Sequence, residues 1–124
     1  MKVISIGDLV TDFYYKNGKL IGVSGGMSSH NIIFNIAKLG LNTAVYGACG
    51  DDALGKVAIN SLQDVGVNID GVKIKKDIHT RSFHVLYQEV DGKLEFVSKK
   101  RCPFCNTKRW YEMSEIEVND ILKQ

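Results

Sequence analysis

The chain of 124 residues is long enough for one small domain, and its 44% hydrophobic and 24% charged residues are ordinary values for a globular protein. Its 16 basic and 14 acidic residues nearly balance, so charge gives no indication of a nucleic-acid or membrane partner. No apolar run is long enough to span a bilayer or to act as a secretory signal. Three cysteines, an odd number, do not suit a secreted disulfide framework, which favours a cytoplasmic protein.

The N-terminal run at residues 2–7 is rich in β-branched side chains and predicts a buried first strand. It delivers Asp8 and Asp12 just past its carboxyl end, which is the edge where α/β sheets bind ligands. For Asp8 a turn-capping role is the better interpretation, whereas for Asp12 capping and a grip on substrate hydroxyls both stay open. The run lacks the G-x-G-x-x-G pattern, so it does not support a Rossmann dinucleotide site.

A double glycine follows the first hairpin signal of the chain. Asn17-Gly18, between two short strand-like runs, is typical of a two-residue β-hairpin turn. Gly25 and Gly26 come next and, without side chains, allow a ligand to approach the backbone closely. The alternative is a tight strand-to-helix connection that needs glycine for its geometry alone, and the dipeptide by itself leaves both open.

The residues after the double glycine predict a helix over 31–39, which Gly40 ends. Ser28 and Ser29 are candidates for its N-cap, so the double glycine should lead into a helix N-terminus with spare N–H donors. A strand, a double glycine and a helix N-terminus together suit a polyhydroxy or anionic ligand.

The middle of the chain predicts a buried strand and a second helix. Residues 43–49 form the apolar strand, and the periodic apolar residues that follow end at Gly66. Asp51 or Asp52 should cap this helix, and capping is the better interpretation of both. The order strand, hairpin, helix, strand, helix predicts an α/β fold.

The last third of the chain predicts strands at residues 69–75, 80–90 and 93–98. Asp91-Gly92 joins the last two as a second hairpin. Because no helix lies among these three strands, we expect antiparallel pairing.

A basic segment over residues 99–111 contains a possible metal site. Cys102 and Cys105 have the C-x-x-C spacing of half a zinc site, but a tetrahedral site needs four ligands. The distant candidates for completing it are few: Cys49, His79, His84 and, with less reason, His30. A thiol pair without metal is the commoner outcome, and a solvated basic loop is preferred over a nucleic-acid contact.

Several of these motifs, in this order, resemble the N-terminal half of the PfkB, or ribokinase-like, carbohydrate kinases. The likeness begins at residues 7–12 (GDLVTD), similar to the family's first strand and substrate aspartate. It continues through the double glycine with Asn31 and the GDDxxG pattern at 50–55. It reaches Thr80, where the family has a threonine that opens a lid strand, and covers residues 1 to about 98. Together these motifs are specific.

The resemblance implies a fold and a reaction. The fold is α/β, a truncated ribokinase-like core (βαβα) with a small antiparallel β-sheet lid formed by residues 12–23 and 69–98. Residues 1–124 would be the N-terminal part of one such domain, with a cysteine-containing insertion at 99–111. The reaction is transfer of phosphate from ATP, with Mg²⁺, to a hydroxyl of a sugar or nucleoside, and a homodimer through the lid is expected.

The resemblance also implies roles for four residues. Asp12 would hydrogen-bond substrate hydroxyls. Gly25 and Gly26 would let the backbone close on the sugar, and Asn31 would orient it at the start of the helix.

Two departures from the family pattern bear on function. Residues 27–30 separate the double glycine from Asn31, one residue more than in ribokinase, and Met27 stands where ribokinase-type members carry a lysine. The substrate should therefore differ. The family's second signature, D-T-x-G-A-G-D, carries the base aspartate and the anion hole, and it does not occur in the sequence. We expect it beyond residue 124, because a last helix with a capping box at Ser114 is cut short.

The leading interpretation is the substrate-binding part of a PfkB-type sugar or nucleoside kinase that is inactive without its catalytic half. One alternative is a non-catalytic sugar-binding or dimerisation module. Another is a small zinc-binding module centred on Cys102 and Cys105.

Overall fold

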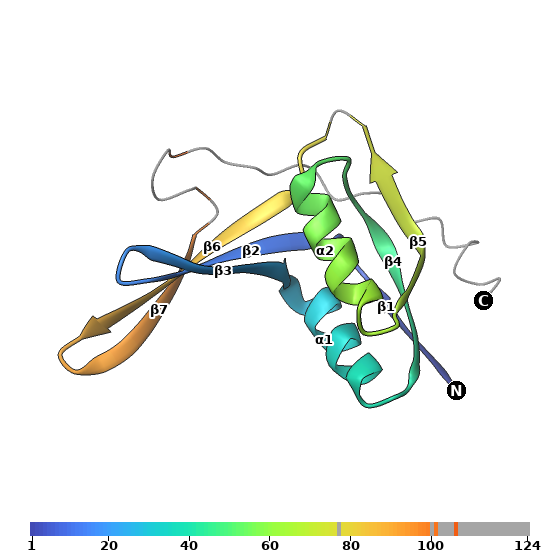
Figure 1. Cartoon of the computed structure of the whole chain (residues 1–124), viewed down its shortest axis with the longest axis horizontal. Coiled ribbons are helices and arrows are strands. Elements are labelled where there is room, and N and C mark those ends of the chain that lie inside the picture. The colour runs from blue at the N-terminus through green and yellow to red at the C-terminus, as the bar shows by residue number, and fades with distance from the viewer. Residues whose placement is uncertain (77, 100, 102–105, 107–124) are drawn as a thin grey trace.

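The computed structural model describes residues 1–76, 78–99, 101 and 106, and within them two β-sheets and two helices (Figure 1). The elements follow in the order β1 (Lys2–Ile6), β2 (Val10–Lys16), β3 (Lys19–Gly26), α1 (Met27–Lys38), β4 (Asn42–Gly50), α2 (Ala53–Gln63), β5 (Asn68–Lys75), β6 (Arg81–Val90) and β7 (Lys93–Lys99). Every strand and helix predicted before residue 99 is present. The expected last helix, Cys102 and Cys105 lie outside the described residues.

A three-stranded parallel sheet, in the order β1-β4-β5, forms the core of the fold. The central strand β4 is buried from Thr43 to Gly50. α1 packs on β1 and β4, and α2 packs on β4 and β5. The buried cluster between these layers includes Ile33, Val45 and Leu62. Removing each such side chain from water contributes roughly 1.5–3 kcal/mol, so apolar burial holds the layers together.

Among the described residues β1 lies at the edge of this sheet, and it is less buried than the sequence predicts. Within the described part of the chain it pairs with β4 alone, and Ile6 is 53% exposed. A β-branched run does not distinguish an edge strand from a central one, because both turn one face to the core.

A second sheet has four strands in the order β3-β2-β6-β7 and extends away from the helices, to the left in Figure 1. Antiparallel pairs flank a parallel pair between β2 and β6. The small sheet is therefore mixed, and the expectation of antiparallel pairing throughout residues 69–98 is wrong. β5 does not belong to this sheet. It pairs in parallel with β4, because α2 forms the crossover of a βαβ unit between them.

Both predicted hairpin turns are confirmed. Asn17 and Gly18 have φ of 48° and 78°, and Asp91 and Gly92 have φ of 51° and 74°. Positive φ at both central residues is the type I′ geometry, whose twist matches that of the flanking strands.

The helix ends follow the sequence signals only in part. Gly40 and Gly66, both with φ of 85°, end α1 and α2 as predicted. The expectation that Ser28 or Ser29 caps α1 is wrong, because the helix begins earlier, at Met27, and its N-cap is a glycine without a side-chain cap. Neither helix of the described residues combines the length and the apolar character needed to cross a membrane.

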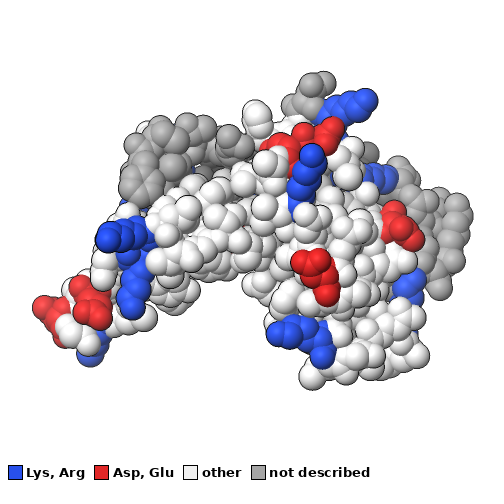
Figure 2. All heavy atoms as spheres, in the orientation of Figure 1, with Lys and Arg blue, Asp and Glu red and all other residues white. Residues whose placement is uncertain are grey.

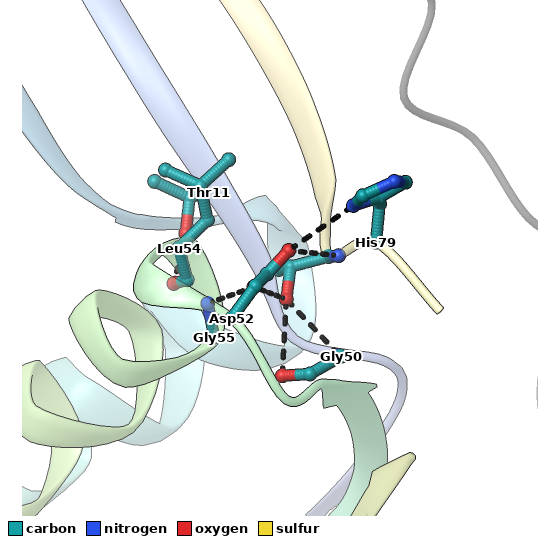
Figure 3. A network of polar contacts seen from close by, with 7 residues as sticks. Thr11, Gly50, Asp52, Leu54, Gly55 and His79 are labelled. Atoms are coloured by element: carbon teal, nitrogen blue, oxygen red, sulfur yellow. Dashed lines mark hydrogen bonds and ion pairs between the residues drawn. The ribbon is translucent and has the colours of Figure 1, made fainter. Parts of the chain in front are cut away.

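The Asp52 carboxylate caps α2, as predicted, and joins three elements (Figure 3). Its Oδ1 accepts hydrogen bonds from the Gly55 N–H at 2.8 Å and from the Thr80 hydroxyl at 2.6 Å. Its Oδ2 accepts from the Thr80 N–H at 2.9 Å. The Gly50 N–H donates to Thr80 Oγ1 at 3.0 Å. The GDDxxG pattern is therefore a structural junction between β4, α2 and the start of β6.

Close packing explains the two glycines of this junction. A Cβ at Gly50 would overlap the carbonyl oxygen of Ile78, and one at Gly55 would overlap that of Gly50. Nearby, the Thr11 hydroxyl donates to the Leu54 carbonyl at 2.7 Å and ties β2 to α2. The four-stranded sheet is thus held against the helices by polar contacts as well as apolar ones.

Thr43 and Thr80 give a matched pair of predictions. Thr43 Oγ1 is buried without a hydrogen-bond partner among the described residues, so Thr43→Val should raise the free energy of unfolding by about 1 kcal/mol. Thr80→Val makes the same chemical change but removes the hydroxyl that bonds Asp52 and Gly50. This substitution should lower the free energy of unfolding by about 2–3 kcal/mol. Urea unfolding of both variants measures this, and a less stable Thr43→Val protein would contradict it.

Candidate functional site

A buried carboxylate with an unused oxygen lies on β2. Asp12 is 8% exposed and pairs with Ser24 of β3 and Phe83 of β6 across the sheet. Its Oδ2 accepts a hydrogen bond from the Tyr14 hydroxyl at 3.3 Å, and its Oδ1 is buried with no partner among the described residues. Burial raises the pKa of Asp12, and the Tyr14 hydrogen bond offsets part of that shift. A buried, unsatisfied acceptor is costly to stability and typical of a ligand site.

Gly26 makes room for this carboxylate. A Cβ at Gly26 would overlap the Asp12 carboxylate group, so no other residue fits without moving it. Gly26 is also the N-cap of α1, with extended backbone (φ −151°). Asp12 is thereby held beside the junction between β3 and α1.

Gly25 makes room for a different side chain on the opposite side of β3. A Cβ there would overlap Nε2 of His30 and stand 2.8 Å from Ser61 Oγ. His30 is 3% exposed, and its Nε2 lies 2.6 Å from Ser61 Oγ. The two glycines therefore leave space for two side chains of the protein itself. A close approach of these glycines to a sugar would be a second role besides this packing.

Asn31 is linked to this group through its neighbour. It is exposed on α1, and its Oδ1 lies 3.3 Å from Nδ1 of His30. Asp12 thus lies against Gly26 on one face of β3, and Asn31 reaches Gly25 through His30 on the other face.

The other early carboxylate, Asp8, has a structural contact. It is buried, its Oδ1 accepts a hydrogen bond from the Ala48 N–H at 3.2 Å, and its carbonyl lies 3.5 Å from the Ser29 hydroxyl. These bonds join the turn after β1 to β4 and α1.

The described candidates for completing a metal site, which are Cys49, His30, His79 and His84, do not assemble one among themselves. Cys49 is buried in the core, and burial raises the pKa of its thiol to about 11. His84 lies 3.0 Å from the Tyr15 hydroxyl, and exposed His79 faces Asp52 at 3.9 Å. No group of three histidine, cysteine or acidic side chains within the described ranges could hold a metal ion, so nothing here supports zinc.

Sequence reasoning missed Tyr14 and underrated His30. Tyr14 was one aromatic residue among several in a strand, and its hydroxyl becomes informative only once Asp12 is known to be buried beside it. The position of His30 could have been suspected, since a polar side chain in the first turns of a helix can pack on a nearby glycine. The sequence does not, however, indicate which residue it would contact.

The fold is similar to that of solved sugar and riboside kinases. A fructokinase structure from Halothermothrix orenii superimposes with a TM-score of 0.69 at 19% identity, covering 99% of this chain and 44% of that one. An aminoimidazole riboside kinase structure from Salmonella enterica gives a TM-score of 0.62 at 27% identity, over 68% and 28% of the two chains. The chain has the ribokinase-like fold.

The sequence assigns the family. Residues 2–121 match the family model described as pfkB family carbohydrate kinase, and the chain belongs to that family. It is 31% identical over 103 residues to fructokinase-2 of Zea mays, a match that covers 77% of this chain and 30% of the maize protein. The chain therefore spans about 30% of the length of that relative.

Asp12→Asn should stabilise the fold at neutral pH. Because the folded pKa of Asp12 is raised, its contribution to stability is complete below the unfolded pKa and is lost as pH rises through the folded value. Asn removes that loss, so the free energy of unfolding at pH 7 should rise by about 1 kcal/mol, with no gain at pH 3.5.

Urea unfolding of the two proteins at both pH values measures this effect. The matched control is Asp64→Asn, at the exposed C-cap of α2. It should leave the free energy of unfolding unchanged at both pH values. A less stable Asp12→Asn protein at pH 7 would mean that the ionised carboxylate is well satisfied after all.

Proposed function

We propose that this chain carries the sugar-binding part of an ATP-dependent kinase that phosphorylates a sugar hydroxyl. The observation that supports this most directly is the buried Oδ1 of Asp12, which has no hydrogen-bond partner among the described residues. A substrate hydroxyl that donates to Oδ1 would satisfy it, and bonds to a charged acceptor contribute about 1.5–3 kcal/mol. Family membership makes a sugar the first choice of ligand.

Two further residues would complete the sugar contacts. Gly26 keeps the carboxylate of Asp12 against the start of α1, so a ligand held by Asp12 lies beside that helix. The exposed amide of Asn31 would orient a second hydroxyl. D-fructose is the first candidate, because the maize relative and the Halothermothrix structure are both named as fructokinases. A nucleoside is the second, after the riboside kinase from Salmonella.

The phosphoryl-transfer signature expected of the family is missing from the residues at hand. A fructokinase from Xylella fastidiosa with a similar fold holds bound ATP. In this sequence the signature D-T-x-G-A-G-D is absent, and the described residues contain no group of three possible metal ligands. We therefore assign no phosphoryl-transfer step to these 124 residues, and propose that they supply substrate recognition.

The expected outcome is binding without turnover. Titration of the ¹⁵N-labelled chain with D-fructose should shift the amide signals of Gly25 and Gly26, and Asp12→Asn should weaken binding at least about tenfold. Asp64→Asn serves as the control and should bind like the unmodified chain. Incubation with ATP, Mg²⁺ and a panel of sugars and nucleosides should release no ADP above background.

Each arm of this experiment decides a different point. Phosphorylation of any member of the panel would contradict the absence of the catalytic machinery. Failure of every sugar and nucleoside to move the Gly25 and Gly26 signals would reject the sugar site, and would favour the alternative of a module for association alone.

We also propose a homodimer through the four-stranded sheet. Exposed apolar side chains gather on its two edge strands, three on β3 and three on β7: Leu20, Ile21, Val23, Leu94, Phe96 and Val97. On the face in Figure 2 charged side chains are scattered rather than gathered into a broad basic area. Apolar edges of this kind suit a second copy of the chain better than a nucleic acid.

Phe96→Glu should weaken this association. Phe96 is 69% exposed on β7, so a glutamate there costs the monomer little and places a charge in the proposed interface. Sedimentation velocity should change from dimer to monomer at micromolar concentration. Leu39→Glu, at the 80% exposed C-cap of α1, is the matched control and should remain dimeric. An unmodified chain that sediments as a monomer would reject the dimer.

A further inference from the structure

The His30 ring occupies a closed position between three elements. It lies on Gly25 of β3, reaches Ser61 of α2 and stacks on Phe34 of its own helix, with ring centroids 5.8 Å apart at an angle of 15°. The side chain is 3% exposed. An imidazole held this tightly has its orientation fixed by its neighbours, so its two nitrogens have fixed partners.

The partners of Ser61 determine where the proton of His30 lies. Ser61 Oγ is 2.9 Å from the Ala58 carbonyl oxygen, and two oxygens at that distance need a proton between them. A serine hydroxyl has one proton, which this contact uses. Nε2 of His30, 2.6 Å from the same Oγ, must therefore carry its own proton and donate it to Ser61.

This assignment determines what Asn31 offers to a ligand. Burial lowers the pKa of His30, so the ring is neutral near pH 7 and its Nδ1 is an acceptor. The side-chain atom of Asn31 that lies 3.3 Å from Nδ1 is placed as Oδ1, which cannot donate a hydrogen bond. A half-turn about the Cβ–Cγ bond exchanges Oδ1 for the NH₂ group, which then donates to Nδ1. The carbonyl oxygen of Asn31 is left free to accept a hydrogen bond from a ligand hydroxyl.

The same ring holds the strand end that carries the site. Successive residues of a strand face opposite sides, so Gly25 faces His30 while Gly26 faces Asp12. A shift of the His30 ring would move Gly25 and its neighbour Gly26. It would thereby change the space at Gly26 that the Asp12 carboxylate occupies. Ser61 anchors the ring to α2 and thereby sets the position of both glycines.

We propose that His30 is a positioning residue of the substrate site, which fixes the Gly25–Gly26 strand end and the Asn31 amide by its hydrogen bond to Ser61 of α2. The role of Asn31 toward a sugar rests on the proposed function. The effect on the two glycines and on Asp12 does not, and can be measured without any ligand.

Two substitutions of His30 separate its hydrogen bond from its bulk. The Nε2 of His30→Gln can still donate to Ser61, whereas His30→Leu fills similar space without a donor. In the ligand-free protein, His30→Leu should shift the amide signals of Gly25 and Gly26 and the carboxyl titration midpoint of Asp12, and His30→Gln should restore them. Ile33→Val, which trims a buried side chain of the same helix, is the control for a general loss of stability and should leave all three in place.

Ser61→Ala tests the anchor without adding an atom, and it should lower the free energy of unfolding because the buried Nε2–H of His30 loses its acceptor. It should shift the same glycine signals and the ring ¹⁵N signals of His30, which in the unmodified chain should have the Nε2–H pattern. An Nδ1–H pattern would overturn the hydrogen-bond assignment. The proposal would be overturned if His30→Leu and Ser61→Ala changed the Gly25, Gly26 and Asp12 signals no more than Ile33→Val does.

Titration with D-fructose adds the ligand-dependent arm. His30→Leu should bind about tenfold more weakly than the unmodified chain, and His30→Gln should recover most of that loss. If D-fructose fails to bind the unmodified chain while the ligand-free signals move as described, His30 is a positioning residue and the proposed sugar function is wrong. If D-fructose binds and the His30 variants bind it equally well, the sugar site stands and the positioning role is rejected.

Discussion

The carboxylate of Asp52 is the contact on which the arrangement of the two sheets depends. The Asp52 side chain caps α2 and accepts hydrogen bonds from both the hydroxyl and the N–H of Thr80, the residue before β6, and Thr80 in turn accepts one from Gly50 of β4. Thr80 is fully buried, so these bonds form in surroundings where an unpaired partner would cost 1–3 kcal/mol, to order of magnitude. β6 pairs in turn with β2, the strand that carries Asp12. The position of the candidate site therefore depends on a junction that contains no site residue.

Asp8, Asp12 and Asp52 are buried or half-buried and differ in how many hydrogen bonds their carboxylates accept. Asp52 accepts three hydrogen bonds, and Asp8 accepts one from the backbone of β4. Asp12 receives a single bond of 3.3 Å from Tyr14, and its other oxygen is without a partner among the described residues. A protein that satisfies Asp8 and Asp52 and leaves an oxygen of Asp12 buried and unused has kept a stability cost, which a ligand hydroxyl can offset.

Local signals in the sequence predicted the fold better than they predicted pairing. The two hairpins and the Asp52 cap were predictable because a turn or a cap is decided within a few residues. The partner of β5 was not, since the choice between β4 and β6 depends on how α2 packs rather than on the strand's own residues. Within the site, Asp12 and the double glycine were identifiable as candidates. Their packing against one another, and the ring of His30 on Gly25, join segments that no periodicity connects.

Met27, between the double glycine and Asn31, has an unusual backbone conformation. This residue has φ of 71°, a left-handed conformation that costs a residue with a side chain roughly 1–2 kcal/mol. It follows Gly26 directly and begins α1, so the strained residue lies in the first turn of the helix. The strain lies between the glycine that receives Asp12 and the helix that carries His30 and Asn31. Strained residues persist where the surrounding structure holds them, and here the His30–Ser61 contact joins the first turn of α1 to α2 while the Met27 side chain stays exposed.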